Sequence, residues 1–223
     1  MNETRVIEVK QNILARNGHA ANAFRAARKT DGTFFLDVMA SPGAGKTTLL
    51  LALIERLRSQ ATCGVIEADL ESDVDALKMK EAGVTSVELN TRGVCHVEMG
   101  MVQKAYDAFA GEHFDYLFLE NIGNLVCPAE FDTGAHARIM LLSVPEGYDK
   151  VYKYPPMFAV VDALVVTKSD YLSLNPDFNM EALHAQARAL NPGLNIFVTS
   201  ARTGEGVDEL TTWLQTHRTA AME

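Results

Sequence analysis

A loop of small residues ends in a lysine and two threonines, the residue types that bind the phosphates of a nucleotide. It reads Ala-Ser-Pro-Gly-Ala-Gly-Lys-Thr-Thr from Ala40 to Thr48 and is flanked by apolar runs. In such a loop, backbone N–H groups and a helix N-terminus surround the phosphates, the lysine contacts the β- and γ-phosphates, and the next hydroxyl binds Mg2+. Ala40 stands where the usual pattern has its first glycine, so the turn must accommodate a methyl group. The residues predicted to bind nucleotide here are Pro42, Gly43, Ala44, Gly45, Lys46, Thr47 and Thr48.

A second motif, Thr167-Lys168-Ser169-Asp170, follows an apolar run and indicates recognition of guanine. The Asp170 carboxylate can accept hydrogen bonds from guanine N1–H and from the exocyclic amine, whereas adenine has neither donor on that edge. The stem of Lys168 can cover the ring face. We expect the backbone of Ser200 and Ala201, after the next apolar run, to contact the guanine carbonyl. GTP is therefore preferred over ATP, and an ATP-driven partitioning or transport ATPase is the alternative.

Acidic residues follow two further apolar runs. Asp69 and Asp75 come after 65–68, and Glu120 comes after 116–119 with Gly123 close behind. Hard oxygen ligands suit Mg2+, and a flexible glycine lets a backbone N–H meet the γ-phosphate. The roles of Asp69 and Asp75 stay open, and helix capping is the alternative for each acid. The predicted catalytic residues are Lys46, Asp69, Glu120 and Gly123, and the predicted Mg2+ ligands are Thr47, Asp69, Asp75 and Glu120.

The elements that must hold these residues alternate between strand-like and helical patterns. Together they predict an α/β fold, a three-layer P-loop NTPase with a mostly parallel sheet. An amphipathic helix from about residue 4 to 29 precedes it, so we expect residues 1–30 to pack on a GTPase domain of residues 31–223 as one structural domain. Strands are predicted at 34–39, 65–68, 116–119, 139–144, 163–167 and 196–199, and helices near 46–59, 74–82, 97–110, 180–190 and 206–217.

Composition narrows the class of protein. The chain has 223 residues, 48% of them hydrophobic, and a formal charge of −9. This suits one globular domain and gives no electrostatic support for nucleic-acid binding. We expect no signal peptide, no membrane span and a cytoplasmic location. Three cysteines are an odd number, which disfavours a disulfide framework, and Cys63 at the start of a strand is expected in the core.

The chain resembles the SIMIBI-class metallochaperone GTPases, and most closely the HypB family of hydrogenase nickel-incorporation GTPases. The resemblance implies GTP hydrolysis coupled to nickel delivery for [NiFe]-hydrogenase maturation by a nucleotide-dependent homodimer. It also implies two partners, a maturation protein that exchanges nickel and the hydrogenase large-subunit precursor. The residues that carry it are 41–47, 92–96 with Met101 and Val102, 120–128, Phe131, Asp132, Gly134, Ser143, Val144, Glu146, Gly147 and 153–155.

Two of the cysteines lie just beyond the predicted nucleotide-sensing segments. Cys95 and His96 follow the Asp69 region, and Cys127 follows Gly123. Taken singly, such residues are more typical of a core thiol or a surface imidazole, but their joint placement and the resemblance favour ligands for Ni2+, with Zn2+ able to occupy the same site. One chain supplies three ligands where either ion needs four, so we expect a site at a homodimer interface.

Departures from the family pattern are few. Ser72 stands where a switch threonine is usual and Thr167 where asparagine is commoner, and the N-terminus has no cysteine cluster or histidine-rich run, so nickel storage is not expected. No arginine finger is evident. Lys150 and Lys153 are candidates to reach a partner's nucleotide, with solvated surface lysines as the alternative.

Two alternative functions stay open: a related urease or cobalamin-enzyme GTPase chaperone, and a metal-binding or storage protein with a regulatory GTP site.

Overall fold

Runs of buried aliphatic and aromatic residues form the strands of one sheet. Because these strands are apolar on both faces, the sheet needs a layer of helices on each side. The computed structural model describes residues 3–69 and 74–223. The sheet has seven strands in the order β3-β2-β4-β1-β5-β6-β7, and every neighbouring pair is parallel. The strands are β1 (Phe34–Ala40), β2 (Cys63–Asp69), β3 (Thr85–Asn90), β4 (Tyr116–Gly123), β5 (Ala137–Ser143), β6 (Ala163–Thr167) and β7 (Asn195–Val198).

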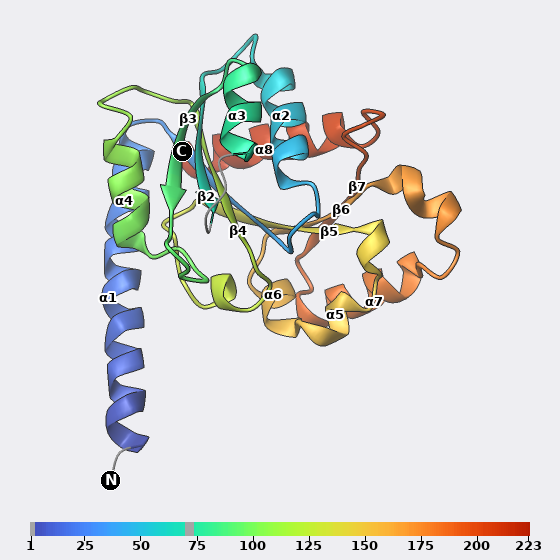
Figure 1. Ribbon diagram of the computed structural model, residues 1–223, viewed down its shortest axis with the longest axis horizontal. Helices are drawn as coiled ribbons and strands as arrows, with labels where there is room; N and C mark the ends of the chain where they lie inside the picture. The colour runs from blue at the N-terminus through green and yellow to red at the C-terminus, as the bar shows by residue number, and fades with distance from the viewer. Residues whose placement is uncertain (1–2, 70–73) are drawn as a thin grey trace.

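Helices cover both faces of this sheet and complete three layers (Figure 1). One face carries α2 (Lys46–Leu57), α3 (Val74–Glu81) and α8 (Val207–Met222). The other face carries α1 (Glu3–Thr30), α4 (Met99–Asp107), α5 (Lys150–Lys153), α6 (Pro155–Ala159) and α7 (Met180–Leu190). Short 3-10 turns lie at η1 (Cys127–Ala129), η2 (Val144–Glu146) and η3 (Ser169–Leu174). The predicted α/β, P-loop type of fold is confirmed.

The central strand β1 divides the core between the two helix layers. Its side chains alternate across the sheet, as they must in any strand. Phe34, Leu36 and Val38 pack with α2 and α8, whereas Phe35 and Met39 face the opposite layer. Both sets are almost completely buried.

The N-terminal helix is anchored by its second half. Ala21 and Phe24 are buried, and the Phe24 ring meets the rings of Phe35 and Tyr106 edge-on, with centroids 5.7 and 5.5 Å apart. The helix then projects beyond the sheet toward its N-terminus (Figure 1). Its predicted span of 4–29 agrees with the observed Glu3–Thr30.

Four elements differ from the sequence-based expectation. The edge strand β3 and the short helices α5 and α6 were not predicted, and α8 runs to Met222 instead of ending near 217. β3 has a half-exposed, alternating pattern over only 6 residues, which is a weak strand signal. The other predicted strands and helices are present with ends shifted by a few residues.

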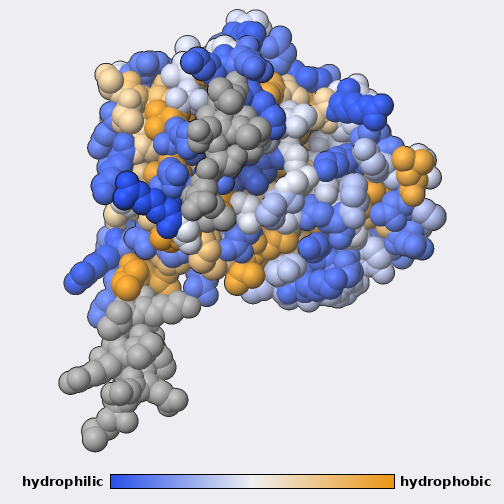
Figure 2. All heavy atoms as spheres, in the orientation of Figure 1, coloured by the Kyte–Doolittle hydropathy of each residue, from blue (hydrophilic) through white to orange (hydrophobic). Residues whose placement is uncertain are grey.

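Hydrophilic side chains predominate on the face shown in Figure 2, interrupted by small hydrophobic spots. Among the described residues, no helix combines the length and the apolar character needed to cross a bilayer.

Candidate functional site

The phosphate-type loop joins β1 to α2 at the carboxyl edge of the sheet. Gly43 and Gly45 have φ angles of 76° and 97°, in the left-handed region that favours glycine, and α2 begins directly afterwards at Lys46. Ala40 does not need such freedom, because it is the last residue of β1 and its methyl is completely buried. The Ser41 hydroxyl donates to the Glu146 carboxylate, which joins the loop to η2.

The first of two adjoining hollows lies over the N-terminus of α2. The Thr47 hydroxyl donates to Glu120 Oε1 at 2.8 Å, and both side chains are buried. A Cβ on Gly123 would lie 2.8 Å from Pro42 Cγ, so the absence of a side chain allows the end of β4 to approach the loop. The lining consists of Gly43, Gly45, Lys46, Thr47, Thr48, Lys78, Glu120 and Lys168.

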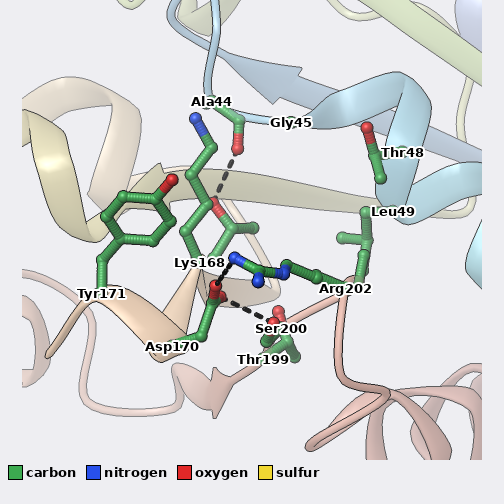
Figure 3. A pocket seen from close by; sticks show the side chains of 12 residues that line it. Ala44, Gly45, Thr48, Leu49, Lys168, Asp170, Tyr171, Thr199, Ser200 and Arg202 are labelled. Atoms are coloured by element: carbon green, nitrogen blue, oxygen red, sulfur yellow. Dashed lines mark hydrogen bonds and ion pairs between the residues drawn. The ribbon is translucent and has the colours of Figure 1, made fainter. Parts of the chain in front are cut away.

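The second hollow continues from the first and contains the predicted guanine residues (Figure 3). Thr167 Oγ1 donates to the Ala44 carbonyl at 2.7 Å, and Lys168 Nζ donates to the Gly43 carbonyl at 2.8 Å. Lys168 adopts a left-handed φ of 58°, which turns the chain at the strand end. The lining consists of Ala44, Gly45, Thr48, Leu49, Thr167, Lys168, Asp170, Tyr171, Thr199, Ser200, Ala201 and Arg202.

The Asp170 carboxylate is held from two sides within this second hollow. Ser200 Oγ donates to Asp170 Oδ1 at 2.7 Å, and Arg202 lies 3.6 Å from Asp170 Oδ2 (Figure 3). Arg202 is 80% exposed, so this ion pair is screened by water. A carboxylate held in this way is oriented before any base arrives.

Most of the predicted nucleotide residues are thus brought together, and five lining residues were missed. Four of them directly adjoin predicted residues, so the motifs could have extended to them: Leu49, Tyr171, Thr199 and Arg202. Lys78 comes from α3 and reaches the phosphate-side hollow through the fold, for which the sequence carries no local signal. Pro42 does not line either of these two hollows.

The predicted Mg2+ ligands divide into two groups. Thr47 and Glu120 meet in the first hollow, whereas Asp69 ends β2 at the same edge of the sheet without lining either hollow. The Asp69 carbonyl accepts the Thr91 N–H at 3.0 Å, which leads the chain toward Cys95. Ser72 and the side chain of Asp75 lie outside the described residues.

Two free thiols meet between the segments that follow β3 and β4. Cys95 Sγ donates to Cys127 Sγ at 3.0 Å, and Cys95 is exposed while Cys127 is half-buried. This hydrogen bond raises the pKa of the Cys95 thiol above its ordinary value. Asn124 joins the two segments, because its Nδ2 donates to the Cys95 carbonyl at 3.0 Å and its Oδ1 accepts the Val126 N–H at 2.9 Å. Soft metal ions prefer thiolate ligands, so a pair of thiols in contact is suited to binding them.

His96 adjoins the thiol pair and is held by its neighbours. Its Nδ1 lies 4.0 Å from Cys95 Sγ, its Nε2 contacts Glu98 Oε1 at 3.2 Å, and its ring stacks on Phe131 with centroids 3.8 Å apart. Within residues 3–69 and 74–223, no group of three or more His, Cys, Asp or Glu residues is arranged to hold a metal ion. The single chain therefore presents a thiol pair with a neighbouring imidazole, not a closed coordination set.

A buried polar cluster links β1 and β4 to the chain beyond Cys127. Asn121 Nδ2 and Thr133 Oγ1 donate to the Asp37 carboxylate at 3.0 and 2.8 Å. Burial raises the pKa of Asp37 to about 6, although these hydrogen bonds act in the opposite direction. Neither partner was predicted from sequence.

Three other singled-out residues lie away from this edge or contact local partners. Cys63 begins β2 and packs against the core, and burial raises its pKa to about 12. Lys153 pairs with Asp149 at 2.5 Å, and Lys150 lies over the ring of Tyr154. The two lysines are therefore engaged within their own segment.

Comparison with known proteins agrees with this geometry. Residues 36–198 match the family model described as CobW/HypB/UreG, nucleotide-binding domain. The hydrogenase maturation factor HypB of Azotobacter chroococcum is 40% identical over 222 residues, covering 100% of this chain and 72% of that protein. The hydrogenase/urease maturation factor HypB of Helicobacter hepaticus is 35% identical over 216 residues, covering 95% and 88%.

A solved structure supports the same relationship. The crystal structure of HypB from Helicobacter pylori in complex with nickel superimposes with a TM-score of 0.88 at 32% identity, covering 93% of this chain and 97% of that one. The chain belongs to the CobW/HypB/UreG family of nucleotide-binding proteins and, within it, to the HypB hydrogenase maturation factors.

Proposed function

We propose that the protein hydrolyses GTP and delivers Ni2+ during [NiFe]-hydrogenase maturation, with nucleotide state controlling the metal site. One observation carries this proposal. A single run of chain at the end of β4 contains Glu120, which contacts Thr47, then Asn124, which is bonded to the Cys95 carbonyl, and then Cys127. Movement at the phosphates therefore displaces a thiol only a few residues away.

The hydrolytic roles belong to residues around the first hollow and to Asp69, which ends β2 at the same edge of the sheet. Lys46 neutralises charge on the β- and γ-phosphates, and the Gly123 N–H contacts the γ-phosphate. Thr47, Glu120 and Asp69 hold Mg2+, either directly or through water, with Asp75 as a further candidate. The buried Thr47–Glu120 pair supports this assignment, because two hard oxygen donors converge beside the phosphate loop. When bound, Mg2+ supplies charge stabilisation to the phosphates.

Guanine specificity follows from the second hollow. Asp170 accepts from guanine N1–H and the exocyclic amine, Lys168 covers the ring, and Ser200 and Ala201 meet the guanine carbonyl. Thr167 supports the arrangement by bonding the phosphate loop at Ala44. GTP and GDP are therefore the ligands, and ATP is rejected.

Nickel is the cargo of the second site. Cys95, Cys127 and His96 bind it, and a second copy of the chain completes the coordination in a homodimer; Zn2+ can occupy the same place. Both cysteines bind the metal as thiolates, so binding releases thiol protons and the affinity rises with pH. Reduced thiols suit the cytoplasm, where a nickel-exchanging maturation protein and the hydrogenase large-subunit precursor are the proposed partners.

A second candidate function is maturation of urease. The relative from Helicobacter hepaticus is named a hydrogenase/urease maturation factor, and a thiol pair is compatible with either recipient enzyme. Hydrogenase and urease activities in a deletion strain, with and without added nickel, separate the two. A metal-storage protein with a regulatory GTP site differs from both, because Asp170→Asn would then leave metal handling unchanged.

The central experiment is a nickel titration in GDP and in a non-hydrolysable GTP analogue, followed by calorimetry and sedimentation. We expect nucleotide to change nickel affinity by about 5- to 150-fold, the size of ordinary coupling between linked sites. Cys127→Ala should abolish the thiol-dependent binding, whereas Cys63→Ala, at the far end of β2, should keep it. Equal nickel affinity in both nucleotides would contradict the proposed coupling.

A further inference from the structure

The N-terminal helix contacts both segments that carry the thiols, through one side-chain amide. Asn17 Oδ1 accepts the Met99 N–H at 2.8 Å, three residues beyond His96. Asn17 Nδ2 donates to the Asp132 carbonyl at 2.7 Å, five residues beyond Cys127. A single half-buried residue of α1 therefore joins two stretches of chain that lie far apart in sequence.

A second residue of α1 fixes one of these stretches more firmly. Arg25 Nη2 donates to both oxygens of the Asp132 carboxylate at 2.7 and 2.8 Å, and its Nε donates to the Ala135 carbonyl at 2.8 Å. Gly134 allows the close approach, since a Cβ there would lie 3.1 Å from the Ala21 carbonyl oxygen on α1. The segment after Cys127 is thus docked on α1 by hydrogen bonds and by close contact.

The same two segments are joined a second time at their other end. Asn124 bonds the Cys95 carbonyl and the Val126 N–H. The two thiols and the stacked pair His96 and Phe131 lie between the Asn124 bridge and the Asn17 bridge along the chain. With both ends tied, the distance between the sulfur atoms is constrained from two directions.

We propose that α1 is a positioning element of the thiol site, and that Asn17 is the residue through which it acts. This inference rests on the proposed function, that Cys95 and Cys127 bind nickel. Hydrogen-bonding groups around metal ligands commonly set ligand orientation, and their loss weakens metal binding about 10- to 100-fold. The family model begins at residue 36, so this role belongs to a helix outside the matched nucleotide-binding domain.

The test compares nickel affinity and the nickel–thiolate charge-transfer absorption in the parent protein and in Asn17→Leu. Leucine has nearly the shape of asparagine but can make neither hydrogen bond. We expect nickel affinity to fall about 10- to 100-fold and the absorption band to change. Basal GTP hydrolysis should stay as in the parent, because Asn17 lines neither hollow. Asn12→Leu is the matched control, since Asn12 is exposed on the same helix.

The outcomes separate the inference from the proposed function. If Asn17→Leu binds nickel as the parent does while Cys127→Ala does not, the positioning role is wrong and the thiol site stands. If the parent itself binds no nickel through its thiols, the proposed function fails. Should Asn17→Leu not fold, Asn17→Asp keeps an acceptor for the Met99 N–H and loses the donor to Asp132. We then expect an intermediate loss of affinity, and parent-like affinity would overturn the inference.

Discussion

Asp170 is the residue on which the proposed guanine specificity of the second hollow depends. Its carboxylate is oriented by Ser200 on one oxygen and faces Arg202 on the other, in a lining with few other charged groups. Hydrogen bonds to a charged group contribute about 1.5–3 kcal/mol, roughly twice the value for neutral partners. Base selection at this site therefore depends on the negative charge as well as on the shape of the hollow.

Replacing that carboxylate by an amide should change the preferred nucleotide. Asp170→Asn loses one of two acceptors for guanine, so we expect GTP affinity to fall about 10- to 150-fold. Xanthosine triphosphate should bind more tightly than it does to the parent, because its ring carbonyl can accept a hydrogen bond from the new amide N–H. Competition binding with both nucleotides measures the change. Asp177→Asn, an exposed carboxyl-to-amide change outside the hollow, is the control, and undiminished GTP binding by Asp170→Asn would exclude the guanine assignment.

Strand β1 does more than carry the phosphate loop. Most of its side chains fill the two apolar layers, but Asp37 is completely buried and bonded to Asn121 on β4 and to Thr133 beyond Cys127. An ionised carboxylate in such a place is stabilised by two donors and destabilised by loss of water, and the second effect is larger. The strand thus contains a group whose protonation affects folding.

The sign of the resulting pH dependence follows from the raised pKa. Asp37 binds its proton more tightly in the folded state, so its contribution to the free energy of unfolding is greatest at low pH and is lost as pH rises through about 6. The pKa of Asp37 is raised from its ordinary value of 3.8 to about 6, and this shift corresponds to a loss of about 3 kcal/mol in the free energy of unfolding. Asp37→Asn cannot ionise, so urea unfolding at a series of pH values should give a shallower decline above pH about 4 than in the parent. Parallel curves for the two proteins would contradict this.

How far sequence alone could predict each element depended on how local its signal was. The phosphate loop and the Thr167–Asp170 motif are contiguous, and parallel strands bring their carboxyl ends to one edge, so it could be predicted that these two motifs lie together. Asp37 could be placed on a buried strand, but its partners come from other elements. Asn17 reaches Asp132 across 115 residues of sequence, and helical periodicity says nothing about such a contact. Strand β3 was missed because a short alternating pattern at a sheet edge resembles a loop.

At the scale of the whole molecule, the thiol pair lies at an exposed surface with apolar neighbours. Val94 and Val126 directly precede Cys95 and Cys127, and 36% and 58% of their surfaces are exposed. An exposed aliphatic residue next to the proposed nickel site is suited to burial against a second copy of the chain. Nickel-linked dimerisation should therefore depend on these valines.

We expect Val126→Asp to weaken the nickel-linked dimer by about tenfold or more, because burying an unpaired carboxylate costs several kcal/mol. Sedimentation velocity with and without Ni2+ measures the dimer, and nucleotide binding should be unaffected. Leu174→Asp is the control, since Leu174 is 75% exposed and lies on η3, the 3-10 turn that also carries Asp170. An unchanged dimer in Val126→Asp would place the contact elsewhere.

The docking of α1 on residues 99 and 132–135 has a consequence during synthesis. A ribosome adds about 5–20 residues per second, so some 100 further residues, and about 5–20 s, separate the emergence of this helix from that of its binding surface. During that interval Phe24 and Ala21, which end up buried, have no partner from the later segments. This helix is synthesised well before the segments on which it packs, so its apolar face lacks those partners until about residue 135 has left the tunnel.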